Sequence, residues 1–377
     1  MKALFLTFFQ LSNDGISKKI LSQRDGLIRS GFDTDLSFEK KDGGRTYFSI
    51  GDKTIYSWKN KSLCRIMARP ALYNRIIKHL KSGTTDFIYI RYTHFATPSA
   101  VRFFKKINRL KIKTALEIPT YPYDGEYGSN SGKSRLMIQL ERWCRKRMAR
   151  FTDKIVTFSD DEIIWNRPTI RISNAVDFNE IQIKKTTSHP GTISLIAVAS
   201  IEKWHGFDRI IEGLREYYQA SQPVEVILNI VGGSDQNTTL RELKRLIETY
   251  HLEKYVVFHG FKTGNELDAL FDQSDVAIGS LGRHRNGIFS MKPLKNREYA
   301  ARGIPFIDSV TDADFENQPY LLKIPADESP VNIQTVVRFF ENGIFNPAEI
   351  RQSVTGFLSW EVQMKIVKDE MFPESLQ

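Results

Sequence analysis

Residues 291–305 read MKPLKNREYAARGIP and decide the fold of the second half of this chain. The segment predicts a helix over 294–302, ended by the glycine and proline that follow. It places Glu298 in the first turn, beside lysine and arginine. A helix N-terminus attracts anions, and a carboxylate there can accept hydrogen bonds from ribose hydroxyls, so the segment predicts a nucleotide diphosphate site. A buried amphipathic helix with an ordinary capping glutamate is the alternative.

Short apolar runs alternate with amphipathic segments through most of the chain, a pattern typical of parallel α/β sheets. In the second half the expected strands are 193–199, 224–231, 256–259, 276–279 and 305–307. The expected helices there are 207–218, 240–250, 266–272 and 294–302. In the first half the expected strands are 3–8, 35–38, 87–91, 113–118 and 154–158. The expected helices there are 17–31, 70–81, 98–111 and 134–150. The pattern predicts two doubly wound α/β units.

The length of 377 residues favours two domains. The aperiodic stretch 184–190 places the boundary nearby, so we expect a first domain of residues 1–178 and a second of residues 179–359. A final helix, 360–371, comes too late for either sheet and is expected to return to the first domain, with 360–377 as its extension.

Charge is unevenly distributed along the chain. The net formal charge is +10, and residues 1–180 carry 33 Lys and Arg against 18 Asp and Glu, which leaves −5 for the remainder. This asymmetry predicts that one half faces an anionic partner, whether a membrane surface, nucleic acid or a phosphate-linked substrate. No interleaved aromatic residues or zinc ligands accompany the charge, so we expect no nucleic acid partner.

The sequence contains no apolar run long enough to span a bilayer, and Cys64 and Cys144 lack metal or disulfide spacing. We therefore expect a cytoplasmic protein. The basic segment 134–150, from Ser134 to Arg150, contains Trp143 and predicts a helix that contacts anionic headgroups at the inner face of the cell membrane. A solvated outer helix is the alternative.

One loop of the first half follows the first expected strand and opens the first helix. Its Gly15 allows a substrate or phosphate to approach the backbone. The neighbouring Ser12 and Asn13 are equally compatible with plain helix capping.

A second loop, residues 117–127, is rich in tyrosine, proline and acid. Tyr121, Tyr123 and Glu126 can stack on sugar faces or bind sugar hydroxyls, which predicts a binding site for a saccharide, such as the acceptor of a sugar-transfer reaction. His94 follows strand 87–91 and is expected at the same mouth. An exposed turn with incidental acids and a structural histidine is the alternative.

In the second half, residues 199–208 read ASIEKWHGFD and link a strand to a helix. Lys203 and His205 lie where a cation can neutralise a diphosphate. Gly232 and Gly233 follow the next strand as a second turn that admits a nucleotide.

Residues 281–287, LGRHRNG, follow a further strand and add Arg283 and Asn286 as donor-binding candidates. Each motif is weak by itself. Their order along the chain predicts a complete nucleotide-binding half.

This succession resembles the retaining glycosyltransferases of the GT-B fold, in particular family 4, which makes capsules, exopolysaccharides and lipopolysaccharides. The resemblance spans nearly the whole chain, including residues 172–177, which are similar to the family's hinge, and the returning C-terminal helix. It implies two Rossmann-like doubly wound domains that face each other across a cleft, with the donor held mainly by the C-terminal one.

The resemblance also implies roles for single residues. Glu298 matches the second glutamate of the family's paired-glutamate motif, which holds the donor ribose, whereas Ser290 stands where the first glutamate belongs. Lys203 and His205 match a basic group against the diphosphate, although Ser200 stands at the usual arginine position.

Two further positions are carried over in the same way. Gly15 matches the N-terminal glycine loop, and Glu117 lies where many members carry a histidine near the transferred sugar. Since Ser290 removes a carboxylate contact to the sugar, the side chains of residues 283–286 are expected to compensate.

Together these features predict a retaining, metal-independent transferase without a cofactor. It would move a hexose from a nucleotide diphosphate sugar to a glycan or lipid-linked saccharide acceptor in surface polysaccharide synthesis. Lys203, His205 and Lys295 are expected to stabilise the charge that the leaving diphosphate gains in the transition state, with Glu117 near the transferred sugar. Two alternatives stay open, a nucleotide-sugar epimerase of the same fold and a non-catalytic sugar-binding protein.

Overall fold

The computed structural model describes residues 1–12, 14–60, 62–123, 132–185, 190–233 and 238–373. The chain divides into two compact units. Unit 1 comprises Met1–Ser173 and Ser359–Gln377, and unit 2 comprises Asn174–Leu358.

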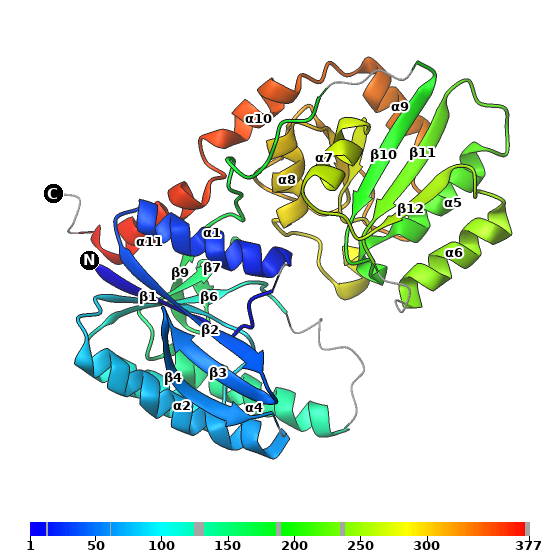
Figure 1. The fold of residues 1–377 in the computed structure, drawn as a ribbon. Helices are drawn as coiled ribbons and strands as arrows, with labels where there is room; N and C mark the ends of the chain where they lie inside the picture. The colour runs from blue at the N-terminus through cyan, green and yellow to red at the C-terminus, as the bar shows by residue number, and fades with distance from the viewer. Residues whose placement is uncertain (13, 61, 124–131, 186–189, 234–237, 374–377) are drawn as a thin grey trace. The chain divides into compact units, whose positions relative to one another are not determined.

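Unit 1 is built on a nine-stranded sheet in the order β4-β3-β2-β1-β5-β6-β7-β9-β8 (Figure 1). Its strands are β1 (Lys2–Leu6), β2 (Asp33–Asp42), β3 (Arg45–Ile50), β4 (Lys53–Lys59), β5 (Phe87–Arg91), β6 (Lys113–Ile118), β7 (Lys154–Thr157), β8 (Ile163–Ile164) and β9 (Arg167–Arg171). β2, β1, β5, β6, β7 and β9 run parallel, and β3, β4 and β8 add antiparallel edges. All five residues of β5 are buried, as expected for a central parallel strand covered on both faces.

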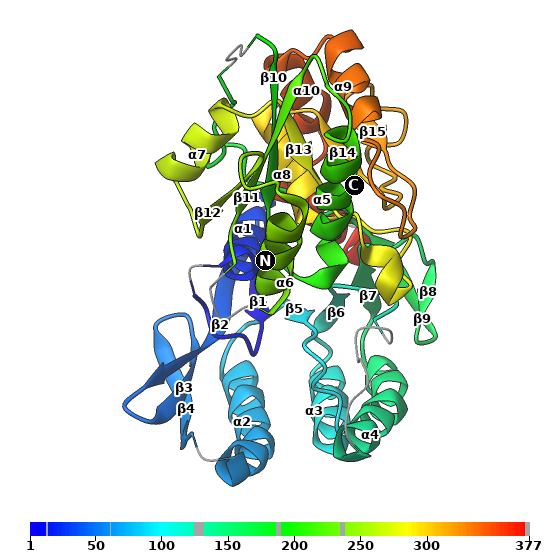
Figure 2. The ribbon, with the colours of Figure 1, turned by 90° about the vertical axis from the view of Figure 1, so that its right-hand side faces the viewer.

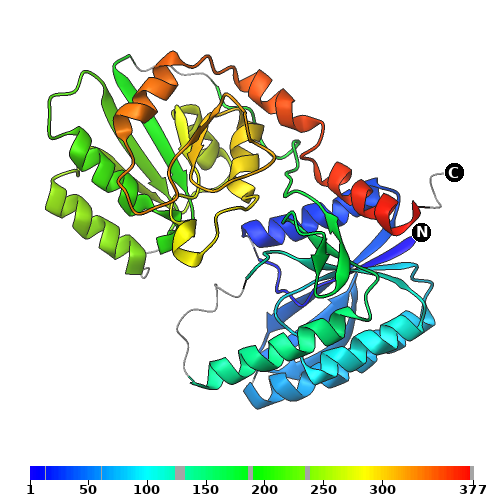
Figure 3. The same ribbon diagram turned by 180° about the vertical axis from the view of Figure 1, so that it is seen from behind.

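Helices cover both faces of this sheet (Figures 1 and 3). α1 (Gly15–Arg29) and α11 (Trp360–Met371) pack against each other on one face. α2 (Ser62–Ser82), α3 (Pro98–Arg109) and α4 (Gly132–Ala149) share a hydrophobic core with β1, β5 and β6 on the other. Local signals set the helix starts, since Thr97 caps α3 ahead of Pro98, and Ser359 caps α11.

Unit 2 contains a six-stranded parallel sheet in the order β12-β11-β10-β13-β14-β15 (Figure 2). The strands are β10 (Thr192–Val198), β11 (Glu225–Val231), β12 (Val256–Gly260), β13 (Val276–Ile278), β14 (Phe306–Asp308) and β15 (Leu321–Lys323). One face packs on α5 (Phe207–Tyr217), α6 (Thr238–Tyr250) and α9 (Ile333–Asn342). The other packs on α7 (Asn265–Asp272), α8 (Leu294–Arg302) and α10 (Pro347–Thr355). The predicted doubly wound α/β class is confirmed.

Two differences separate the structure from the expected organisation. The hairpin strands β3, β4, β8 and β9, the edge strand β15 and the helices α9 and α10 were not expected. The boundary between the units falls after residue 173 instead of 178. Residues 174–178 are bound to unit 2, because the Asn174 amide donates to the Lys292 carbonyl (2.6 Å) and Arg351 donates to the Phe178 carbonyl.

The returning helix completes unit 1. α11 lies against α1, where the Lys19 ammonium is 5.4 Å from the Trp360 ring. None of the helices formed by the described residues is both long and apolar enough to cross a membrane.

Replacing Gly26 by alanine is expected to destabilise unit 1 by roughly 1–3 kcal/mol. A Cβ at Gly26 would lie 2.5 Å from the Trp360 carbonyl oxygen, so α11 would have to move away from α1. Urea unfolding of the variant measures the effect.

The matched control is Gly15→Ala in the same helix, where a Cβ would meet no atom within 4 Å. Alanine favours helices over glycine, so the control is expected to be neutral or slightly stabilising. Equal stability of the two variants would contradict close packing of α11 on α1.

Candidate active site

The site in unit 2 begins at the point where the strand order reverses. β10 and β13 are neighbours, and the chain leaves them in opposite directions across the sheet. The loops that follow them, residues 199–206 and 279–287, flank the carboxyl ends of the strands, where open α/β sheets bind ligands. We call these two segments the switch-point loops.

Two glycines hold the switch-point loops in direct contact. A Cβ at Gly206, whose φ is 68°, would lie 2.7 Å from the backbone nitrogen of Gly282. The Leu281 N–H also donates to the His205 carbonyl at 3.0 Å. The backbones meet without intervening side chains, and this sets the positions of the side chains on both loops.

Helix α8 begins next to these loops. It spans Leu294–Arg302 and ends at Gly303, whose φ is 77° and whose Cβ would lie 2.2 Å from the Pro347 carbonyl oxygen, so the expected helix and stop are confirmed. Lys295 is its second residue, and its ammonium lies 3.4 Å from the Gly279 carbonyl. A cation is thereby placed beside the helix N-terminus.

Glu298 is not in the first turn of α8, which contains no acidic residue, so that expectation is wrong. The helix starts at Leu294, which puts Glu298 one turn further in. There its Oε1 accepts hydrogen bonds from Arg302 Nε (3.1 Å) and Nη2 (2.9 Å). The side chain remains one-third exposed, so it is oriented by Arg302 and still reachable.

His205 lies close to two cations and is not itself one. Burial, followed by the charges of Lys295 and Arg283, lowers its pKa to about 2. Its Nδ1 accepts the N–H of Glu202 at 3.0 Å. The expectation that His205 neutralises a diphosphate as a cation is therefore wrong; it is a neutral ring stacked 5.5 Å from Phe207.

We call Lys295 and Arg283 the positive cluster. Asp308, at the end of β14, is the carboxylate that interacts with Lys295. It is fully buried, and its Oδ1 accepts the N–H groups of Val310 (3.0 Å) and Ser280 (3.3 Å). Burial raises the pKa of Asp308 and lowers that of Lys295, while the charge of Asp308 partly restores the pKa of Lys295. Asp308 thus supports the protonated form of Lys295.

Asp308 was not among the site residues predicted from the sequence. Its signal was its place directly after an expected strand, at the carboxyl end of a parallel sheet. Gly279 is its structural complement, because a Cβ there would lie 2.5 Å from Asp308 Oδ2.

Lys203 and Ser290 are both exposed. The Lys203 ammonium is 3.3 Å from Glu242 Oε2 and two-thirds exposed. Ser290 is exposed and forms an isolated bridge with Thr311. Lys203 is therefore engaged by α6, in an exposed ion pair that contributes little energy.

The loop 283–286 divides into two roles. Arg283 is half-buried, with its guanidinium 5.6 Å from the Trp204 ring, and Asn286 is half-buried as well. Arg285 binds Asp208 (2.7 Å) and Glu328 (2.5 Å), and His284 also contacts Glu328. Arg285 and His284 are thus committed to other side chains, contrary to the expectation that they supply ligand contacts.

Gly232 and Gly233 lie beside the switch-point loops and have a packing role. Their φ values are 114° and 76°. A Cβ at Gly232 would lie 1.9 Å from the Ala199 carbonyl oxygen, and one at Gly233 would lie 2.6 Å from Ile201. These glycines allow the end of β11 to pack against the loop 199–206.

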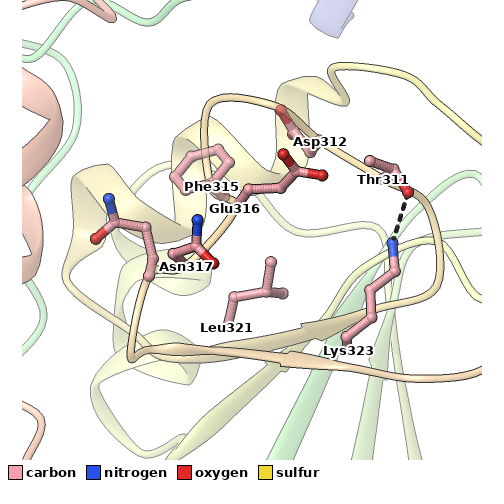
Figure 4. A pocket seen from close by; sticks show the side chains of 8 residues that line it. Thr311, Asp312, Phe315, Glu316, Asn317, Leu321 and Lys323 are labelled. Carbon is pink, nitrogen blue, oxygen red and sulfur yellow. Dashed lines mark hydrogen bonds between the residues drawn. The ribbon is translucent and has the colours of Figure 1, made fainter.

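A cavity of about 230 Å³ lies between β15 and the loop that joins β14 to β15 (Figure 4). In it, the Lys323 ammonium donates to the Thr311 hydroxyl at 3.4 Å, and Glu316 points toward Asp312. Asp312 is held by the buried Arg297. The cavity is smaller than typical small-molecule pockets, roughly 300–1,000 Å³, and we assign it no ligand.

Glu117, in unit 1, is fully buried in β6 and does not face a substrate. Its Oε2 accepts from Tyr89 (2.6 Å) and Gln23 (2.7 Å), its Oε1 pairs with Arg91, and the Lys19 ammonium lies 3.9 Å away. Burial acts to raise the pKa of Glu117, but Arg91 and Lys19 hold it below the usual value. The expected catalytic role is wrong, because the carboxylate is enclosed by structural partners.

The expected acceptor residues are partly brought together. The exposed His94 lies with its ring 4.6 Å from that of Tyr123, which is buried and donates its hydroxyl to Glu141 at 2.7 Å. Tyr121 is half-buried, and Glu126 lies outside the described residues.

Gly15 opens α1 in unit 1, where a Cβ would meet nothing within 4 Å. Its backbone is therefore open on that side. Among the described residues, no group of three His, Cys, Asp or Glu side chains is arranged to hold a metal ion.

Comparisons with known proteins agree with this architecture. Residues 178–310 match the family model described as "Glycosyl transferases group 1". The Escherichia coli protein named "Putative colanic acid biosynthesis glycosyltransferase WcaL" is 28% identical over 145 residues, 38% of this chain and 34% of that relative. An uncharacterized ABC transporter extracellular-binding protein of Pyrococcus horikoshii is 31% identical over 35% of this chain and 34% of its own length. The match thus spans about a third of each curated relative.

Solved structures resemble the whole chain. Sucrose-phosphate synthase from Thermosynechococcus elongatus has a TM-score of 0.66 at 13% identity and covers 100% of this chain and 98% of its own. HepE from Anabaena, in complex with UDP, has a TM-score of 0.62 at 13% identity, with both chains fully covered. The fold is that of the GT-B glycosyltransferases.

Replacing Glu117 by glutamine is expected to destabilise unit 1 by about 3–5 kcal/mol, because Arg91 and Lys19 would lose their buried counter-charge. Tyr89→Phe is the control and is expected to cost about 1 kcal/mol, since only one hydrogen bond is lost. Urea unfolding compares the two. Equal losses would mean that the charge of Glu117 does not hold this network.

Replacing Asp308 by asparagine is expected to change the pH dependence of stability. The native state raises the pKa of Asp308 above its ordinary 3.8, so this group's stabilising contribution is present at low pH and lost as pH rises through the raised pKa. The difference in free energy of unfolding between Asp308→Asn and the wild type should therefore shift in favour of the variant as pH rises from 4 to 7, by at least about 1.4 kcal/mol, the equivalent of one pKa unit.

Urea unfolding at several pH values measures this difference. Asp327→Asn is a control of opposite sign, because hydrogen bonds from Ser329 lower the pKa of Asp327. A pH-independent difference between Asp308→Asn and the wild type would refute the assigned environment of Asp308.

Proposed function

We propose that this protein is a retaining, metal-independent glycosyltransferase that moves a hexose from a nucleotide diphosphate sugar to a glycan or lipid-linked saccharide acceptor in surface polysaccharide synthesis. The observation that carries the proposal is the positive cluster of Lys295 and Arg283 at the switch-point loops. The match of residues 178–310 to group 1 glycosyl transferases and the GT-B fold support it.

The cluster suits a diphosphate leaving group. As the anomeric bond breaks, negative charge accumulates on the diphosphate, and fixed cations near it stabilise the transition state more than the ground state. Lys295 stands at the N-terminus of α8, whose unpaired N–H groups add to the positive potential. Asp308 and Arg283 act in opposite directions on the charge of Lys295.

Glu298 is our candidate for the ribose. Its side chain is one-third exposed, and Arg302 fixes its Oε1, so the second oxygen is available to accept hydrogen bonds from ribose hydroxyls. HepE has been solved with UDP and with UDP-glucose, which makes a uridine nucleotide the first probe to use.

The proposed sites for the hexose and for the acceptor carry fewer charged side chains than the proposed diphosphate site. Ser290 offers a hydroxyl where a carboxylate was expected, so contacts to the hexose would fall to Ser290, Asn286 and nearby backbone N–H groups. On unit 1, the exposed His94 and the half-buried Tyr121 provide ring faces for a saccharide acceptor.

Lys295→Ala is expected to weaken UDP binding about 10–100-fold, the equivalent of one charge-assisted hydrogen bond of roughly 1.5–3 kcal/mol. Because burial lowers the pKa of Lys295, wild-type affinity should fall as alkaline pH removes its proton, and the variant should lack this dependence. Titration calorimetry measures both effects.

Lys254→Ala is the matched control, since Lys254 precedes β12 at the opposite end of the sheet and pairs with Glu225. It should bind UDP as the wild type does. Glu298→Ala should weaken binding of UDP more than binding of inorganic diphosphate. Wild-type UDP affinity in both Lys295→Ala and Glu298→Ala would place the nucleotide elsewhere.

The two alternatives predict different products. An epimerase would release an isomerised nucleotide sugar without any acceptor. A sugar-binding protein would bind free glucose as tightly as UDP-glucose, and the cations near α8 would have no role.

A further inference from the structure

Three neighbouring helices of unit 1 present a face on which the exposed charged side chains of the described residues are all basic. α2, α3 and α4 lie side by side on one side of the sheet (Figure 2). The sequences of α2 and α3 contain no Asp or Glu, and the one carboxylate of α4, Glu141, is buried. Their exposed cations, which we call the basic face, are Arg75, Lys78, Lys81, Arg102, Lys105, Lys106, Arg109, Arg142, Lys146 and Arg147.

The helices place these charges outward by their periodicity. In α3, Phe103, Phe104 and Ile107 pack into the core, so Arg102 and Lys105, on the opposite side, point away from the sheet. α2 and α4 repeat the arrangement with their own buried stripes. The apolar halves thus fix the basic halves in one layer.

Several of these cations have no carboxylate partner in the part of the chain that the structure describes. Arg75, Lys78, Arg102, Lys105 and Arg109 form no ion pair with any described residue. Cations elsewhere in unit 1 do find carboxylates, as Lys154 does with Glu370 at 2.5 Å. The positive excess of the first half of the sequence is therefore concentrated on this layer.

An aromatic side chain stands among the cations. Trp143 of α4 is 53% exposed, and the Arg147 guanidinium lies 3.6 Å from its ring. Helices that lie in the headgroup region of a bilayer combine exposed tryptophan with lysine and arginine in this way. A polyanion without apolar groups would bind the cations but would make no favourable contact with the exposed Trp143 ring, whereas a bilayer would bind both.

The basic face also contains a hollow that suits a phosphate group. A cavity of about 120 Å³ lies between α2 and α3, lined by Tyr73, Asn74, Arg102 and Lys106, among others. The Lys106 ammonium is held toward it by the Asn74 amide oxygen at 2.8 Å. Two cations thus border a space large enough for one lipid headgroup phosphate.

We propose that the basic face docks unit 1 on a bilayer rich in anionic phospholipid, with Trp143 at the headgroup level. The sequence pointed only to the segment 134–150; the structure adds α2 and α3 as the larger part of the surface. This inference stands independently of the reaction proposed above, although a lipid-linked acceptor would be found at the same surface.

Vesicle sedimentation tests the proposal without any sugar donor. Wild-type protein is mixed with vesicles of phosphatidylcholine alone or with about one-third phosphatidylglycerol at 0.1 M salt. We expect binding to the anionic vesicles only. The triple variant R102Q/K105Q/R109Q should bind them at least tenfold more weakly, since each basic residue near such a surface contributes a factor of about five.

The matched control is R241Q/K244Q/R245Q, which removes the same charge from exposed positions of α6 in unit 2 and should bind as the wild type does. Trp143→Ala should lose binding that persists at 0.5 M salt. Circular dichroism confirms that each variant is folded.

Three outcomes would overturn the proposal. They are equal binding of wild type to neutral and anionic vesicles, equal losses in the α3 and α6 triples, and tighter binding of a 20-base-pair DNA or RNA duplex than of vesicles. Failure of the UDP experiment leaves these readouts unaffected, so the two proposals can fail separately.

Discussion

The contact between the backbones of Gly206 and Gly282 is the constraint on which the site in unit 2 depends. At this point the loops after β10 and β13 touch without side chains, and the Leu281 N–H bonds to the His205 carbonyl. A side chain at either glycine would push the loops apart. Because His205 is on one loop and Arg283 on the other, the same contact determines how closely the cation Arg283 approaches the neutral His205 ring beside Lys295.

Elements with local punctuation could be predicted from the sequence. The bounds of α8 and α11 and of the strands β5 and β6 agree with the expected ones, since caps, glycine stops and buried apolar runs act within a few residues. The hairpin β3–β4 was not predicted because charged and polar residues interrupt its apolar pattern, although Gly43 and Gly44 provide a turn between β2 and β3 and Phe48, Ile50 and Trp58 join the core. These strands are held by pairing with β2 at the edge of the sheet.

The site could be predicted by position and not by pairing. The sequence predicted a site at the carboxyl ends of the strands, and Arg283 and Lys295 lie near the end of β13. It could not tell that Arg285 is taken by Asp208 and Glu328, or that Glu117 is enclosed by Arg91 and Tyr89. Those partners are 26 to 77 residues away in the chain, so only the fold brings them together.

The return of α11 to unit 1 has a consequence for biosynthesis. Trp360 and Met364 lie against Gly26 of α1, and Phe372 packs near Phe32 and Phe87. During translation these surfaces stay open to water until residues after 358 leave the ribosome, by which time all of unit 2 has been made. Unit 2 can therefore fold first, and the earliest part of the chain is the last to be covered.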